Sequence, residues 1–154
     1  MEKFIENIQS ANKTIKIIDH MVYVTFPLIK DKRLLLKILL ETKKAIVDCI
    51  NSILQYEYLY KRIKLYKNQK ENLRTFKEKC ASKYNITKQE INLINELFEI
   101  AEQHKKSPFE FIKDKKIIIL SEELQPKIIT FEKTKEFLIL GKNILNKTKQ
   151  VILR

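Results

Sequence analysis

The side chains best suited to chemistry in this sequence are the lysines, arginines and tyrosines between Tyr56 and Lys88, here called the basic segment. The basic segment holds ten Lys or Arg and three Glu, so it supplies +7 of the net charge of +12. Five tyrosines are interspersed among these charges. Ammonium and guanidinium groups neutralise phosphates, and tyrosine rings stack on nucleobases. The composition of the basic segment therefore predicts a surface that binds RNA or another polyanion.

The candidate binding residues follow from their positions on a helix. Tyr56 and Tyr60 are four residues apart and are expected to pack on the core, whereas Tyr58 points away from it. We therefore assign nucleic-acid binding to Tyr58, Lys61, Arg62, Lys64, Tyr66, Lys67, Lys70 and Arg74. The alternative is that these residues form a solvated surface without a partner, because lysine is abundant throughout the chain and raises its charge everywhere.

No local motif indicates catalysis or a cofactor. The single glycine, Gly141, excludes a glycine-rich phosphate loop. The neighbours Asp19 and His20 point about 100° apart on a helix, so they do not form an acid–base pair. A zinc site would need residues from four separate elements, none with the usual ligand spacing: Cys49, Cys80, His20 and His104. We expect no metal, no cofactor and no catalytic residue, although distant side chains can still assemble a site.

The elements that position the basic segment are predicted to be helices, since one glycine and three prolines leave few tight turns. Apolar residues recur at steps of three and four, as on the buried face of a helix. Thr25-Phe26-Pro27 is expected to break the first helix. The predicted helices are Phe4 to about Val24, about Lys32 to about Lys67, a shorter one with Leu73, Phe76 and Cys80, Lys88 to about Lys106, and Phe131 to about Ile152.

Two capping signals and two β-rich runs complete the pattern. Thr87 and Glu90 form a capping box before a helix whose expected buried face is Ile91, Ile94, Leu97, Phe98 and Ala101. Ser107-Pro108 repeats the start signal, which predicts a short helix to about Lys113. Ile117–Leu120 and Lys127–Thr130 flank the turn residues 121–126, so a small β-hairpin is expected near residues 116–130, packed on the helices.

The sequence as a whole predicts a mainly α protein. We expect a single domain over residues 1–154, built as one bundle of long antiparallel helices with the small hairpin appended. Two cysteines without paired spacing favour a reducing compartment such as the cytoplasm. A membrane partner is not expected, because the uncharged apolar run Met21–Ile29 is far shorter than a spanning helix needs.

A second function is left open by the apolar stripes of the first and last helices. Such stripes can bury against the same chain or against another one, so they are also typical of a scaffold protein that dimerises or holds a protein partner. A third possibility is a basic C-terminal helix lying on an anionic membrane surface, through Lys133, Lys135, Lys142, Lys147 and Lys149.

The chain resembles two known families, one through two stretches of its sequence and the other through its predicted arrangement of helices. The runs Asp19–Leu35 and Asn51–Arg62 resemble a family of small archaeal helical proteins without an assigned activity. The arrangement of long helices is also similar to HEPN domains, helical bundles that often bind or cleave RNA. Nuclease HEPN domains carry an arginine four to six residues before a histidine, and neither His20 nor His104 has one. The resemblance therefore implies a non-catalytic member.

Overall fold

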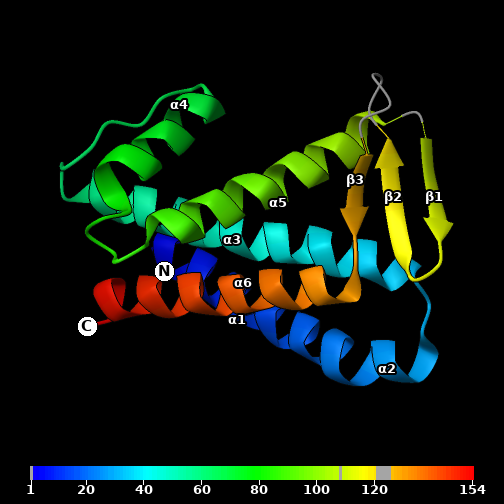
Figure 1. Cartoon of the computed structure of the whole chain (residues 1–154). Helices are drawn as coiled ribbons and strands as arrows, with labels where there is room; N and C mark the ends of the chain where they lie inside the picture. Colours follow the sequence, from blue (N-terminus) through cyan, green and yellow to red (C-terminus); the bar gives the residue numbers. More distant parts are fainter. Residues whose placement is uncertain (1, 108, 121–125) are drawn as a thin grey trace.

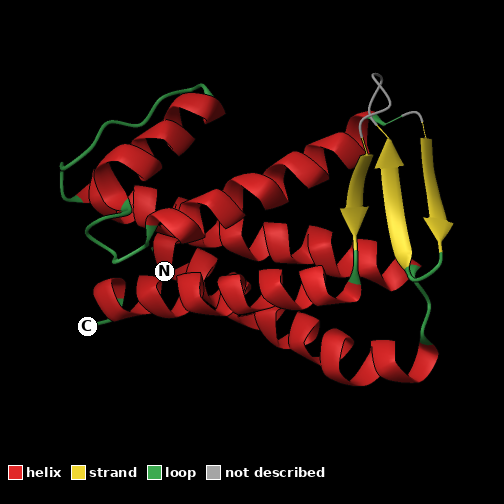
Figure 2. Ribbon diagram, in the orientation of Figure 1, coloured by secondary structure: helices red, strands yellow, loops and turns green. Residues whose placement is uncertain are grey.

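The computed structural model describes residues 2–107, 109–120 and 126–154 (Figure 1). It confirms a mainly α fold with a small β element appended (Figure 2). The label η marks two single turns of π-helix. The elements are α1 (Lys3–His20), η1 (Met21–Thr25), α2 (Phe26–Ile29), α3 (Arg33–Leu59), α4 (Gln69–Thr75), η2 (Phe76–Cys80), α5 (Lys88–Lys106), β1 (Phe109–Lys113), β2 (Lys116–Leu120), β3 (Pro126–Ile129) and α6 (Phe131–Ile152).

Helix α3 lies at the centre of the bundle. It runs antiparallel to α1 and contacts α6 along its length, and α6 also contacts α1 (Figure 1). The apolar stripes of these three helices meet in one continuous cluster of buried side chains, which includes Ile18, Ile46 and Phe137. Burial of these stripes is the main favourable contribution to folding. Helix α5 contacts α3 and α6 and crosses the bundle at an angle.

Gly141 is where α6 approaches α1 and α3 most closely. A Cβ added at Gly141 would lie 2.9 Å from Cδ1 of Ile15 and 3.6 Å from Cγ2 of Thr42. Even alanine at this position would therefore displace the Ile15 side chain. A glycine inside a helix is therefore used here to allow a close approach of neighbouring helices.

The predicted break at Thr25-Phe26-Pro27 is wrong, because the helical course continues to Ile29. A proline ring normally clashes with the carbonyl four residues earlier and removes one backbone donor. Here the π turn η1 directly precedes α2, and the Phe26 N–H bonds to the Met21 carbonyl five residues back. The extra residue in this turn shifts the carbonyls that face Pro27. The helix stops instead at Lys30, which adopts a left-handed conformation with φ of 57°.

The predicted end of the second helix near Lys67 is also wrong, since α3 stops at Leu59. Lys61 has a left-handed φ of 59°, and its N–H bonds to the Tyr58 carbonyl at 2.9 Å. The Arg62 N–H bonds to the Glu57 carbonyl at 3.0 Å. These two bonds are the Schellman pattern that closes a helix, here with lysine in place of the usual glycine. A lysine in that role could not be recognised from its residue type.

The predicted hairpin is confirmed but is part of a three-stranded antiparallel sheet with the order β1-β2-β3. Its turn, residues 121–125, lies outside the described residues. Ile117 and Ile119 are buried on the face of β2 that packs on α3 and α5. The sheet therefore depends on the helices, as expected of so small a sheet.

The short helix predicted up to about Lys113 is wrong, because residues 109–113 form β1. Each of these residues pairs with one in β2, from Phe109 with Leu120 to Lys113 with Lys116. A helix of about six residues is marginal in water, whereas pairing with β2 gives the segment backbone hydrogen bonds along its whole length. Asp114, with φ of 56°, makes the tight connection.

The starts of the last two long helices are as predicted. Thr87 accepts a hydrogen bond from the Glu90 N–H, and the Glu90 carboxylate accepts one from the Thr87 N–H, which completes the capping box of α5. On α5, Ile94, Leu97 and Ala101 are buried as expected. Ile91 and Phe98 are only half-buried, because α4 diverges from α5 and leaves that side open (Figure 1).

Candidate nucleic-acid interface

The basic segment occupies one end of the bundle and consists of the last turn of α3, a loop, α4, η2 and the turn before α5. The loop is tied to α4 by the side chain of Asn72, which accepts from the Tyr66 N–H at 2.7 Å and donates to the Tyr66 carbonyl at 2.8 Å. Asn68 caps α4 by accepting from the Lys70 N–H. Residues 60–68 therefore hold a defined course although they are neither helix nor strand.

A buried carboxylate anchors this loop. Glu57 is only 2% exposed and lies on the core-facing side of α3. One of its oxygens lies 2.7 Å from Nη2 of Arg62, and the other lies 2.7 Å from Nζ of Lys83. The Arg62 guanidinium also lies above the Tyr60 ring, 4.9 Å from its centroid. Arg62 and Lys83 thus connect the loop and the turn after η2 to α3.

The two arginines among the predicted binding residues are ion-paired, whereas the lysines are not. Arg62 pairs with Glu57, and Arg74 pairs with Glu78 at 3.1 Å one helical turn away. Within the described part of the chain, an exposed set of four lysines makes no ion pair: Lys61, Lys64, Lys67 and Lys70. These lysines lie on the loop and at the start of α4, and all four are exposed.

Three tyrosines of the basic segment are exposed. Tyr58 and Tyr66 are exposed as predicted, at 54% and 46%. Tyr60 was expected to pack on the core but is 55% exposed, because α3 ends one residue before it and the chain turns away. Tyr56 remains half-buried with its ring edge against Phe4. Tyr60 is therefore an exposed aromatic face that the helical pattern missed.

Tyr84 belongs to the interior of this end rather than to its surface. It is 1% exposed, and its hydroxyl finds no hydrogen-bond partner among the described residues. Burial, followed by the nearby charge of Glu57, raises the pKa of the Tyr84 hydroxyl. This ring packs in the core under the surface that the lysines form, so it is not a stacking candidate.

The roles of Glu57 and Lys83 were missed by the sequence analysis. They are separated by 26 residues, so no local spacing links them. One signal was present: Glu57 lies four residues after the core residue Ile53, and an acid on a buried stripe needs a cation. The sequence does not show which cation that is.

The other candidate residues are dispersed. Cys49 and Cys80 are free and buried, and burial raises the pKa of the Cys49 thiol to about 12 and that of Cys80 to about 11. Such thiols are poor nucleophiles near neutral pH. His20 is exposed on α1, whereas His104 contacts Glu110 of β1. No cluster of three or more His, Cys, Asp or Glu suited to a metal ion occurs among the residues described.

Over the described ranges, no helix has both the length and the apolar character that crossing a membrane requires. Comparison with protein-family models, with curated proteins and with solved structures finds no match to this chain. The resemblances noted from the sequence therefore stay predictions, and the proposed function rests on the residues of the surface itself.

Proposed function

We propose that this protein is a non-enzymatic binding protein whose basic segment binds RNA or another polyanion. The observation that carries the proposal is the set of four exposed, unpaired lysines beside exposed tyrosines on a loop of defined course. The ligand's phosphates would be neutralised by Lys61, Lys64, Lys67 and Lys70. Its bases would be stacked rather than read by hydrogen bonds, so binding would show little sequence preference.

The local charge balance supports this assignment. Of the three acids in the basic segment, Glu57 and Glu78 are already paired with cations, so Glu71 is the one that makes no ion pair with a described residue. A concentration of unpaired positive charge at one end of a small protein attracts phosphate chains and releases their counterions. We place the protein in a reducing compartment such as the cytoplasm, because both cysteines are free.

Arg62 is a poor residue with which to test this proposal. Its reversal to glutamate would place a second carboxylate against the buried Glu57 and would disturb the loop whether or not a ligand binds. Lys64 and Lys67 are exposed and make no ion pair with any described residue, so they report on binding alone.

The double variant Lys64→Glu/Lys67→Glu is expected to bind a fluorescent single-stranded RNA about tenfold more weakly or worse. Loss of two phosphate contacts also makes the slope of log K against log salt less steep, by about 1.4 for a single strand. Fluorescence anisotropy at several salt concentrations measures both quantities. The matched control is Lys13→Glu/Lys16→Glu, which makes the same change in net charge on exposed residues of α1. An equal loss in both variants would overturn the assignment to the basic segment, as would binding that ignores salt.

A second function is favoured by exposed apolar side chains where α1 continues into α2. Ile17, Val24 and Leu28, here called the seam, are 51%, 44% and 79% exposed, and neighbouring exposed apolar side chains are typical of a surface that packs against another protein. The alternative is therefore a scaffold protein that pairs this seam with the same seam of a second copy, as two-fold symmetry allows.

Light scattering over a range of concentrations tests the alternative. If it holds, the wild type is dimeric, and Leu28→Asp halves the measured mass because it places a charge in the seam. Leu153→Asp is the control, since Leu153 is also an exposed leucine but follows α6, away from the seam. A wild type that stays monomeric at all concentrations would exclude this function.

A further inference from the structure

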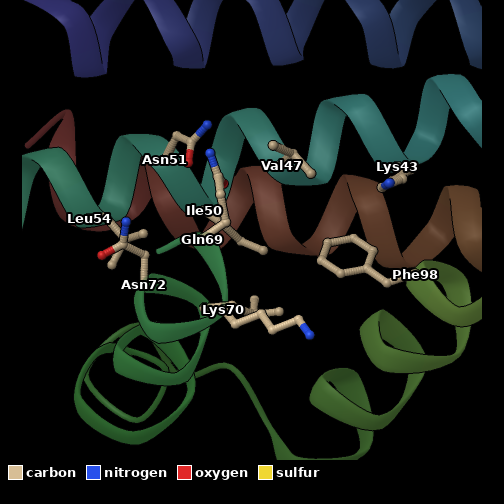
Figure 3. Close-up of a pocket in the computed structure, with 10 residues that line it drawn as sticks. Lys43, Val47, Ile50, Asn51, Leu54, Gln69, Lys70, Asn72 and Phe98 are labelled. Carbon is tan, nitrogen blue, oxygen red and sulfur yellow. The ribbon is translucent and has the colours of Figure 1, made fainter. Parts of the chain in front are cut away.

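A groove of about 330 Å³ opens between α3, α4 and α5, next to the basic segment (Figure 3). This volume is at the lower end of the range typical of small-ligand sites. Its floor is apolar and comes from all three helices, as side chains of Val47, Ile50, Leu54, Leu73 and Phe98. Ile50 and Leu54 are buried at its base, whereas Val47, Leu73 and Phe98 are half-buried.

The rim of the groove is polar and carries positive charge only. Lys43 of α3 and Lys70 of α4 line it, and the Phe98 ring lies between them in Figure 3. The Lys43 ammonium is 5.7 Å from the centroid of that ring. No aspartate or glutamate is among the described residues that line the groove. The charge of the rim therefore suits an anionic ligand with an apolar, planar part.

Two amide side chains at the rim have no competing partner. Asn51 and Gln69 are exposed, and neither side chain makes a hydrogen bond to another described residue. Asn72, the third amide, is already bound to Tyr66 at both its oxygen and its nitrogen. A free amide offers both a donor and an acceptor, which matches the edge of a nucleobase.

The groove and the surface assigned to phosphates are neighbours along the chain. Gln69 and Lys70, which line it, directly follow the loop that holds Lys61, Lys64 and Lys67. A strand whose phosphates lie on this loop can therefore turn one base into the groove without leaving the basic segment. A protein surface that combines cations with one apolar, aromatic recess is typical of single-strand binding.

We propose that this groove takes one unstacked base of a single-stranded nucleic acid, stacked on Phe98, with its flanking phosphates on Lys43 and Lys70. The proposal rests on the proposed function, since the loop lysines hold the rest of the strand. It makes the affinity depend on whether the ligand carries a base, which phosphate neutralisation alone does not do. Bases are accepted through their aromatic faces, so every base is a possible occupant.

The test compares two polyanions that differ in whether they carry bases. Labelled oligoadenylate is titrated with the protein, and inorganic polyphosphate of similar charge serves as the ligand without bases. The wild type is expected to bind oligoadenylate about tenfold more tightly, as one stacked base provides. Phe98→Leu keeps an apolar floor of similar volume and should weaken oligoadenylate binding about tenfold while leaving polyphosphate binding unchanged, whereas Phe98→Tyr keeps the aromatic face and should retain both affinities.

Controls separate the groove from the surface in general. Tyr23→Leu removes an exposed aromatic ring of η1, outside the groove, and should leave both affinities unchanged. Circular dichroism confirms that each variant is folded, and Phe98→Tyr keeps the comparison valid if Phe98→Leu is destabilised. Equal affinity of the wild type for both polyanions, or a base preference that Phe98→Leu does not reduce, overturns the base site but leaves polyanion binding in place. Binding to neither polyanion overturns the proposed function together with it.

Discussion

Replacement of both Arg62 and Lys83 by alanine is expected to lower the free energy of unfolding by about 3–5 kcal/mol, the usual consequence of leaving a buried carboxylate without its partner. Glu57 is 2% exposed, and these two side chains are the cations that the structure places on its oxygens. Both cations are themselves partly exposed, so the expected loss comes from the stranded carboxylate and not from the exposed ends of the pairs. Urea denaturation followed by circular dichroism measures it.

Two controls make the interpretation specific. Lys61→Ala/Lys79→Ala removes two exposed lysines of the same segment that pair with no described residue, and it should change stability by less than about 0.5 kcal/mol. Adding Glu57→Gln to the Arg62→Ala/Lys83→Ala variant removes the stranded charge and should recover part of the loss. A double variant as stable as the wild type would show that the buried pair does not stabilise the fold.

The second large effect is expected from Phe76→Ala. Phe76 is fully buried in η2, which contacts α3 and fixes the middle of the basic segment to the bundle. Truncation of a buried phenylalanine costs about 3–5 kcal/mol through lost burial and the cavity left behind. Residues 69–86 should lose protection from amide hydrogen exchange before α1, α3 and α6 do, because they depend most directly on this ring.

Hydrogen exchange measured by mass spectrometry checks that order. Phe26→Ala is the comparison, because Phe26 is half-buried at the other end of the bundle, where its ring stacks on Phe131. Its truncation should leave protection of residues 69–86 unchanged. Uniform loss of protection across all helices in Phe76→Ala would contradict a locally anchored segment and would indicate that the whole chain unfolds as one unit.

The long helices could be predicted because their signals are local. The capping box at Thr87 fixes the start of α5 with side chains three residues apart, and the apolar period of α6 runs unbroken from Phe131 to Ile152. Along most of the long helices, the buried residues are those that the three-and-four spacing of apolar residues predicts. These features need no knowledge of what lies across the core, so a single sequence contains them.

The failures lie where a distant partner or an unusual backbone decides the outcome. The helix expected to reach Lys67 ends at Leu59, because Lys61 adopts a left-handed conformation. That conformation can be recognised only from the structure, through the Glu57–Arg62 ion pair and the backbone hydrogen bonds around Lys61. The strand β1 forms because β2 is beside it, and the sequence of residues 109–113 does not reveal that neighbour. Pro27 ends no helix because a π turn precedes it.

The residues of the candidate site also fall into some that the sequence could predict and some that it could not. The lysines and tyrosines of the basic segment could be chosen from composition, and the exposure of Tyr58 from helical direction. The groove could not be chosen, because Lys43, Lys70 and Phe98 come from three helices. In the sequence, Phe98 is one more apolar residue of a buried face. Its proposed second role, as the stacking surface for a base, depends on the divergence of α4 and α5.

The contact of α6 with α1 and α3 at Gly141 also determines the order in which the chain can fold as it is synthesised. Helices α1 and α3 are joined through η1, α2 and three further residues, and they can form a helical hairpin as soon as Leu59 has left the ribosome. On the face of that hairpin around Ile15 and Thr42 packs α6, which is completed roughly 90 residues later. At typical rates of synthesis this interval is about 5–20 s. For that time the nascent chain presents an open apolar face, so this hairpin is the part of the molecule most exposed to misassembly during translation.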